Sequence, residues 1–255
     1  MRGKETFRGP ELKLHRAETH IIDLHGLLKR FMEAQTYKII ADFEREPGYI
    51  CFVGQGEEVF PHDEFAPIIG DVIHNLRDAL DLAVSVIMRN AGRSDRGVMF
   101  LTGRDANAFK RAIKQRSEKV KWPQDFLQVL ETRIQPYEGG NGYLLRVLHE
   151  LSITDKHRLL VPTVFGTSSV TVNTEGIRFP IYTGVYPVAI KDGGVYFRCL
   201  TSDFPDIKVG QKANVTLSIA FDGIGRPLDA IPVDDALRRL LQKTKEAIDA
   251  LRSCL

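Results

Sequence analysis

The spacing of apolar residues changes near residue 160 and divides the chain into two parts. Before that point, in segments 11–35 and 63–91, apolar residues recur every three or four positions, which is the pattern of an amphipathic helix. After it, in 215–221, every second residue is large and apolar, as in a half-buried antiparallel strand. Helices and strands that are grouped in this way, rather than alternating, predict an α+β fold.

The remaining segments complete this outline. Two β-rich runs, 37–43 and 49–53, flank a Pro-Gly turn and predict a hairpin after the first helix. We expect one α+β domain over residues 1–255, made of a helical body with an N-terminal hairpin (about 11–160), an antiparallel β layer (about 163–222) and a closing helix (about 233–253). Further helices are predicted at 105–116, 123–134 and 143–160, and further strands at 170–172 and 195–199.

Composition narrows the class of protein. Lysine and arginine exceed aspartate and glutamate by 35 − 33 = +2, so a nucleic-acid partner would need a local concentration of positive charge. The three cysteines are widely spaced and predict neither a disulfide framework nor a thiolate zinc site. No phosphate-binding loop, nucleophile elbow or zinc-protease motif occurs. Because no run is apolar enough for a signal peptide or membrane helix, we expect a cytoplasmic protein with no membrane partner.

The segment 63–91 carries the most unusual polar residues of the chain. At about 100° per residue its apolar side chains share one face, and a polar arc lies opposite. One interpretation is a solvated helix face with exposed ion pairs, which contribute little stability. Apolar residues also fall beside the arc near the end of the segment, which favours burial on both sides there. The arc contains Asp71, His74, Asp78 and Asp81 along a single ridge, with Asn75 and Arg77 beside it.

A second segment, 143–160, places charges where its core face should continue. Asp155 follows Leu151 by four residues, and Arg158 follows Leu151 by seven. Burying either charge without a partner is costly, so a buried cluster would have to be shared with another helix. Two alternatives remain open: the helix ends near residue 152 with Asp155 capping a turn, or the basic residues after Asp155 simply complement the helix dipole.

The segment 63–91 is the expected partner in such a cluster. We expect Arg77 to pair with Asp155. We expect Asp78 or Asp81 to receive Arg158, and His74 to lie beside His157. A shared cluster of ionisable groups with altered pKa values is where a functional site would be sought.

Other polar groupings give weaker signals. The histidines at 15, 20 and 25 point in different directions, which favours surface residues over a metal site. Asp71 and His74 have the spacing of half a di-iron motif, but the second half is missing, so we expect no metal and no cofactor. A basic run with Phe109 and Trp122 nearby is either a phosphate-binding patch or a solvated charged face. The run contains Lys110, Arg111, Lys114, Arg116, Lys119 and Lys121.

A resemblance to a known group of proteins rests on three stretches: GDVIHNLRDALDLAV, IQPY and LHELSITDKHRLL. They resemble uncharacterised bacterial and phage proteins that carry an HNLRxALD … DKHR motif pair on two helices ahead of a β-rich tail. The resemblance covers about residues 60–160 and implies kinship of fold, but it brings no activity with it. It also implies that the following residues belong to one feature: His74, Asn75, Arg77, Asp81, Asp155, Lys156, His157 and Arg158.

A second, weaker likeness is to HEPN helical-bundle ribonucleases, whose site pairs an arginine and a histidine on one helix. Here the order is reversed, because His74 precedes Arg77.

Two functions are therefore expected as alternatives. The first is metal-independent cleavage of RNA or another phosphodiester, with RNA or another phosphate-bearing ligand as partner. The second is a non-catalytic interaction module whose cluster is a structural network between helices, and a homo-oligomer is compatible with either. The catalytic candidates are His74, Arg77, His157 and Arg158, and the binding candidates are Asn75, Asp78, Asp81, Asp155, Lys156, Lys110, Arg111 and Lys114.

Overall fold

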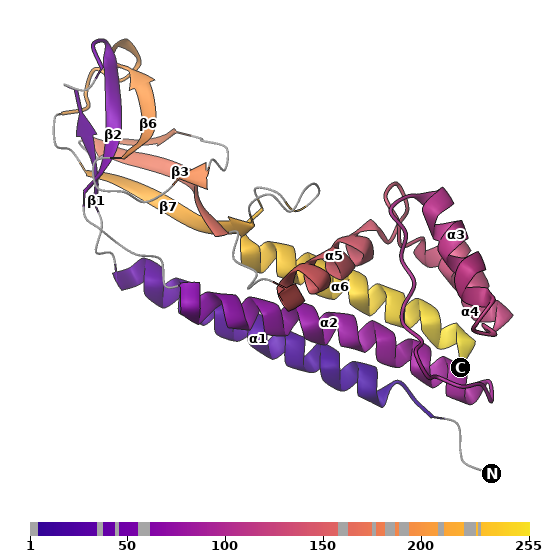
Figure 1. Cartoon of the computed structure of the whole chain (residues 1–255). Helices are drawn as coiled ribbons and strands as arrows, with labels where there is room; N and C mark the ends of the chain where they lie inside the picture. Colours follow the sequence, from indigo (N-terminus) through magenta and orange to yellow (C-terminus); the bar gives the residue numbers. More distant parts are fainter. Residues whose placement is uncertain are drawn as a thin grey trace. The chain divides into compact units, whose positions relative to one another are not determined.

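The computed structural model has the α+β fold that the sequence predicts (Figure 1). It describes residues 5–34, 38–43, 46–55, 62–157, 163–174, 177–181, 187–188, 194–208, 212–221, 228 and 231–255. The chain divides into two compact units. The first, the helical unit, comprises Met1–His25, Asp63–Leu160 and Asp234–Leu255; the second, the strand unit, comprises Gly26–His62 and Val161–Val233.

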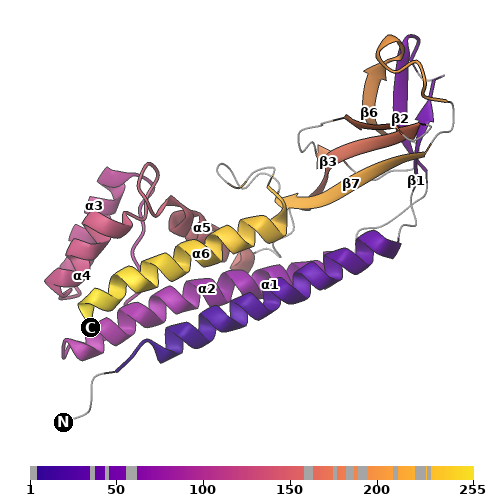
Figure 2. The same cartoon turned by 180° about the vertical axis from the view of Figure 1, so that it is seen from behind.

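The helical unit contains most of three long helices, which lie side by side in both views (Figures 1 and 2). α1 (Arg8–Ala34) runs antiparallel to α2 (His62–Asn90) and to α6 (Val233–Leu251). None of the helices in the described part of the chain has the length and apolar composition needed to span a bilayer. The shorter helical segments are α3 (Ala106–Ser117), α4 (Gln124–Val129), a π-helical turn (Leu130–Ile134), α5 (Tyr143–His157) and a 3-10 turn (Arg252–Cys254).

The core of the helical unit is formed by the apolar stripes of these helices. On α1 the predicted stripe is buried at Ala17, Ile21 and Leu24. On α2, Val86 and Met88 are 4% and 1% exposed, although they lie away from the main stripe. The end of α2 is therefore buried on both sides, which confirms the expectation from its sequence.

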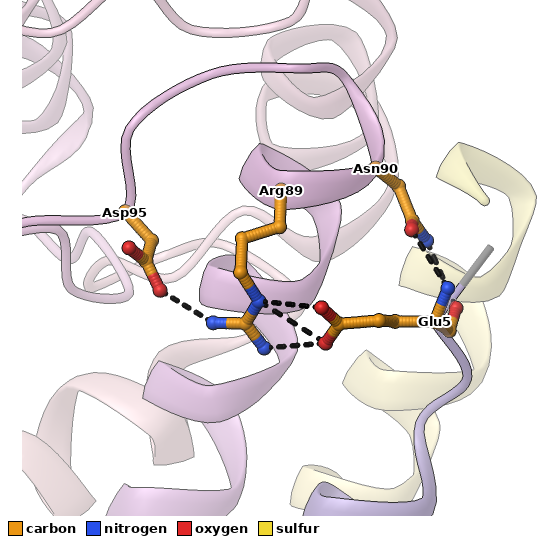
Figure 3. A network of polar contacts seen from close by, with 4 residues as sticks. All are labelled: Glu5, Arg89, Asn90 and Asp95. Atoms are coloured by element: carbon orange, nitrogen blue, oxygen red, sulfur yellow. Dashed lines mark hydrogen bonds and ion pairs between the residues drawn. The ribbon is translucent and has the colours of Figure 1, made fainter. Parts of the chain in front are cut away.

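Polar contacts fasten the first described residues to the end of α2 (Figure 3). Arg89 donates to the carboxylate of Glu5 from Nε and Nη2 at 2.7–3.1 Å, and it also donates to Asp95 from Nη1. The side-chain amide of Asn90 forms two hydrogen bonds with the backbone of Glu5, each 2.9 Å long. These groups are partly exposed, so their main effect is to fix the start of the chain beside α2.

A loop held by close backbone contacts sets where α5 begins. After the π-helical turn, Gln135 adopts a left-handed conformation with φ of 51°. A Cβ atom on Gly140 would lie 2.3 Å from the carbonyl oxygen of Gln135, and one on Gly142 would lie 2.5 Å from that of Ile134. Only glycine fits these approaches, so the spacing of glycines determines where Tyr143 starts α5.

The strand unit contains one antiparallel sheet with the strand order β4-β3-β7-β1-β2-β6, in which β5 also pairs with β3. The predicted hairpin is formed by β1 (Lys38–Asp42) and β2 (Tyr49–Gln55). It belongs to this sheet and not to the helical body, because β1 pairs with β7 (Lys212–Phe221) and β2 with β6 (Val195–Leu200). The remaining elements are β3 (Thr163–Thr174), β4 (Ile177–Ile181), β5 (Pro187–Val188) and a 3-10 turn (Thr201–Asp203).

Candidate functional site

The polar ridge of α2 contacts several neighbouring segments. Asp78 forms an ion pair with Lys13 of α1, with 2.8 Å between Oδ2 and Nζ. Asp71 lies 3.9 Å from Nε2 of His20, also on α1. The side chains of Asp71 and Asp78 are nevertheless 61% and 51% exposed, so this part of the ridge lies at the surface.

The contact of greatest chemical interest joins α2 to α5. Nε2 of His74 lies 2.8 Å from Oδ2 of Asp155, and the two side chains are 34% and 11% exposed. The expectation that Asp155 turns toward another helix is therefore confirmed. On α2 it contacts His74, whereas the sequence analysis assigned Arg77 to it.

A glycine on α2 makes room for this carboxylate. Gly70 lies one turn before His74, and a Cβ atom on Gly70 would lie 2.7 Å from Oδ2 and 3.2 Å from Oδ1 of Asp155. A side chain at position 70 would therefore overlap the carboxylate. Replacing Gly70 with alanine would therefore prevent the carboxylate of Asp155 from reaching His74 in its present position.

Arg77 has a different set of partners from the predicted ones. It donates to Asp81 from Nε at 3.2 Å and from Nη2 at 2.9 Å, and to the carbonyl oxygen of Phe100 at 2.8 Å. The backbone N–H of Phe100 in turn donates to Oδ1 of Asp81 at 2.6 Å. The pair thus fastens the segment after α2 onto the helix. Asp81 is i+4 to Arg77, a spacing at which side chains on a helix meet without a second helix.

Burial sets the electrostatics of this pair. The side chain of Arg77 is 6% exposed, and its Nη1 has no hydrogen-bond partner among the residues that the structure describes. Burial lowers the pKa of Arg77, although Asp81 opposes the shift. Burial also raises the pKa of Asp81, against the opposing effects of Arg77 and of the Phe100 amide. A guanidinium so deeply buried cannot meet the phosphate of a polymer, so Arg77 is a structural residue.

The basic end of α5 lies next to Asp155 in the chain. Lys156 and His157 are the last two residues of α5. The side chains of these two residues, and Arg158 as a whole, lie outside the described part of the structure. The predicted contacts of Arg158 with Asp78 or Asp81, and of His157 with His74, therefore stay predictions.

The sequence analysis missed two residues of this region. Gly70 is one, because nothing in a sequence distinguishes a helical glycine that faces a carboxylate from one that faces solvent. His20 is the other, and it had been treated as a surface residue although its side chain is 12% exposed. A signal was present, since His20 lies three residues after Ala17 and four before Leu24, both buried.

The remaining described candidates take no part in the His74–Asp155 contact. Asn75 donates from Nδ2 to the carbonyl oxygen of Asp71 at 2.7 Å, a contact within its own helix. Lys110, Arg111 and Lys114 are exposed on α3. The structure therefore separates these predicted site residues into a His–Asp pair, a pair of a buried arginine with a partly exposed aspartate, and a basic helix.

The His74–Asp155 pair has the properties of an acid–base group. When the imidazole is neutral and donates from Nε2 to Asp155, its lone pair lies on Nδ1. The carboxylate fixes the ring orientation, and a third of the side chain remains accessible to a substrate. No group of three or more side chains suited to binding a metal ion occurs among the residues that the structure describes.

No protein-family model matches the chain, and no curated protein or solved structure matches it either.

Proposed function

We propose that this protein cleaves RNA without a metal ion and that His74 is its general base. The observation that supports the proposal is the 2.8 Å contact between His74 and Asp155, with the imidazole one-third exposed. A histidine that is one-third exposed and oriented by a nearly buried carboxylate is the arrangement that general acid–base catalysis needs. In this role Asp155 is a positioning residue, because it acts through His74.

The reaction that suits such a pair is transfer of a phosphodiester to the neighbouring 2′-hydroxyl. Nδ1 of His74 accepts the proton of the 2′-hydroxyl, whose oxygen then bonds to phosphorus. The bond from phosphorus to the 5′-oxygen breaks, and that oxygen takes a proton from a general acid. The products are a 2′,3′-cyclic phosphate and a free 5′-hydroxyl, and no oxidant or cofactor is consumed.

Chain connectivity supports a role for the end of α5 in the same step. Lys156 and His157 directly follow Asp155, and consecutive Cα atoms are about 3.8 Å apart. A second imidazole and two cationic side chains therefore follow the carboxylate within three residues of the chain. We assign His157 as the general acid, and Lys156 and Arg158 as the groups that stabilise the charge on phosphorus. Arg77 is left out of this set because it is buried.

The test is cleavage of end-labelled RNA by the purified protein with and without EDTA. We expect cleavage that EDTA leaves unchanged and that His74→Ala reduces about 100-fold or more. His15→Ala is the matched control, because His15 is an exposed histidine on α1. Absence of cleavage by the wild-type protein, or equal rates for the two variants, would refute the proposal.

A second candidate function is a non-catalytic interaction module. The observation that favours it is the pairing of the buried Arg77 with Asp81 and with the backbone of Phe100, which fastens the segment after α2. If the His74–Asp155 pair is structural too, Asp155→Ala should lower the free energy of unfolding by about 3 kcal/mol or more, as when a buried charge loses its partner. A catalytic pair should instead lose no more than about 1.5–3 kcal/mol, the contribution of its hydrogen bond, and RNA cleavage should be lost with it. For either function we propose a cytoplasmic location, which the free cysteines at 51, 199 and 254 support.

A further inference from the structure

α3 and the turn that follows it carry a strong excess of positive charge. Residues 104–121 contain seven lysines and arginines and two acidic residues, so their net charge is 7 − 2 = +5. The whole chain has a net charge of only +2. The positive charge is therefore concentrated in this segment and balanced elsewhere, which is the local footprint that a near-neutral chain needs to hold a polyanion.

Most of these cations are exposed, and apart from Arg104 none of them forms an ion pair with an acidic side chain in the described part of the chain. α3 buries Phe109 and Ile113 against the helical unit and contains no acidic residue. Among the described residues, the ion pair in this segment is that of Arg104 with Asp105. The exposed cations, which we call the basic face, are Lys110, Arg111, Lys114, Lys119 and Lys121.

The basic face has no exposed aromatic side chain. The sequence analysis noted Phe109 and Trp122 near these cations, but the two side chains are 1% and 4% exposed. Their rings pack inside, with Phe109 against Tyr137 at 5.4 Å and Trp122 against Phe126 at 5.4 Å. Proteins that hold single strands stack bases on exposed aromatic rings, so this face lacks the means to do so.

The chemistry of the face selects among polyanions. A membrane-binding surface needs apolar side chains that enter the lipid, and near this face the exposed large apolar residue is Met99, at 37%. Lysines and arginines without aromatic neighbours suit a regular array of phosphates. We propose that the basic face binds the phosphate backbone of a double-stranded nucleic acid, without reading its sequence.

The basic face is separate from the His74–Asp155 pair. Arg93, which follows the end of α2, donates from Nη1 to the carbonyl oxygen of Lys121 and so anchors the basic face at that end of the helix. His74 lies 90 − 74 = 16 residues before the last residue of α2, or about 24 Å along the axis. Binding at the basic face does not depend on the proposed cleavage. If the protein both cleaves RNA and binds duplexes at this face, its substrate is an RNA that contains a duplex.

The test is fluorescence anisotropy with labelled duplexes of about 20 base pairs and a single strand of the same length, at salt concentrations from about 50 to 200 mM. Contacts from five cations predict a slope of about −4.5 for log K against log salt, or about 500-fold weaker binding over this range. We expect both duplexes to bind more tightly than the single strand. RNA and DNA duplexes are tested separately, and a preference between them identifies the natural polymer.

Neutralising variants locate the binding surface. The triple variant K110Q/R111Q/K114Q should reduce the magnitude of the salt slope by about 2.7. The control R30Q/R238Q/R239Q removes three exposed arginines outside the basic face and should leave the slope unchanged. If the triple variant does not fold, Lys114→Gln alone should reduce the slope by about 0.9.

Three results would overturn the proposal: no duplex binding by the wild-type protein at the lowest salt, equal losses in the two triple variants, or tighter binding of the single strand. His74→Ala should bind duplex as the wild type does. If duplexes bind but RNA is not cleaved, the cleavage proposal fails and the binding proposal stands. If a short RNA is cleaved but duplexes do not bind, the binding proposal fails and the cleavage proposal stands.

Discussion

Replacing Gly70 with alanine tests the contact between α2 and α5 through a single methyl group. In the interior of a helix, glycine to alanine normally stabilises a protein by about 1 kcal/mol. At position 70 the new Cβ would lie 2.7 Å from Oδ2 of Asp155, well inside van der Waals contact. The carboxylate is the atom group that can move, and moving it takes Oδ2 away from Nε2 of His74.

The net effect follows from the two opposing contributions. A hydrogen bond that involves a charged group contributes about 1.5–3 kcal/mol, and its loss outweighs the usual gain. We therefore expect Gly70→Ala to lower the free energy of unfolding by about 0.5–2 kcal/mol. In an Asp155→Ala background the obstacle is gone, and the same change should stabilise by about 1 kcal/mol.

The assay is urea denaturation of the wild type, both single variants and the double variant, which form a double-mutant cycle. Gly26→Ala is the control, because Gly26 lies inside α1 and its Cβ would meet the nearest atom, on Arg30, at an ordinary 3.7 Å. This control should be stabilising. If Gly70→Ala were as stabilising as Gly26→Ala, or had the same effect in both backgrounds, Asp155 would not lie against α2 as described.

Three further predictions concern other parts of the chain. Arg77→Ala should lower the free energy of unfolding by about 3 kcal/mol in urea denaturation, since it leaves the Phe100 carbonyl without its donor; a change near zero would contradict this structural role. The backbone N–H of Ala108 donates to Asp105 and lowers its pKa, so this cap stabilises α3 at neutral pH and loses its effect as the pH falls through the lowered pKa. Asp105→Ala should therefore lower the melting temperature at pH 7 but not at about pH 2. An equal effect at both pH values would contradict this role of Asp105. Burial raises the pKa of Cys199 to about 11, so near pH 8 its alkylation should be about 200-fold slower than that of a free thiol. Rapid labelling would show that this thiol is not buried.

The helical elements were predictable because local signals fix them. The long helix α2 begins with acidic residues and ends before Gly92, and both ends agree with the sequence pattern to one residue. The place of the hairpin was not predictable in the same way. Its strands were correctly expected from β-rich runs around Pro47 and Gly48, but their neighbours in the sheet, β6 and β7, lie well over a hundred residues away in sequence. Pairing across such distances leaves no local pattern.

The sequence pointed to His74 and Asp155 but did not pair them with each other. The apolar spacing of α5 correctly indicated that Asp155 faces the core side. A carboxylate in that place needs a partner, and this predicted a contact with another helix. Which residue of α2 it contacts depends on the axial position at which α5 packs against α2. The spacing of apolar residues does not determine that position. Arg77 could have been assigned correctly, since Asp81 is four residues away on the same helix, a pairing that local geometry favours.

The most direct measurement of the central claim is the rate of RNA cleavage by Asp155→Asn under single-turnover conditions. The variant keeps the size of the side chain but no longer holds the imidazole in the required tautomer. With His74 as the general base and Asp155 holding it, the rate should fall about 100-fold or more, while the urea midpoint stays near that of the wild type. An unchanged cleavage rate would contradict the account.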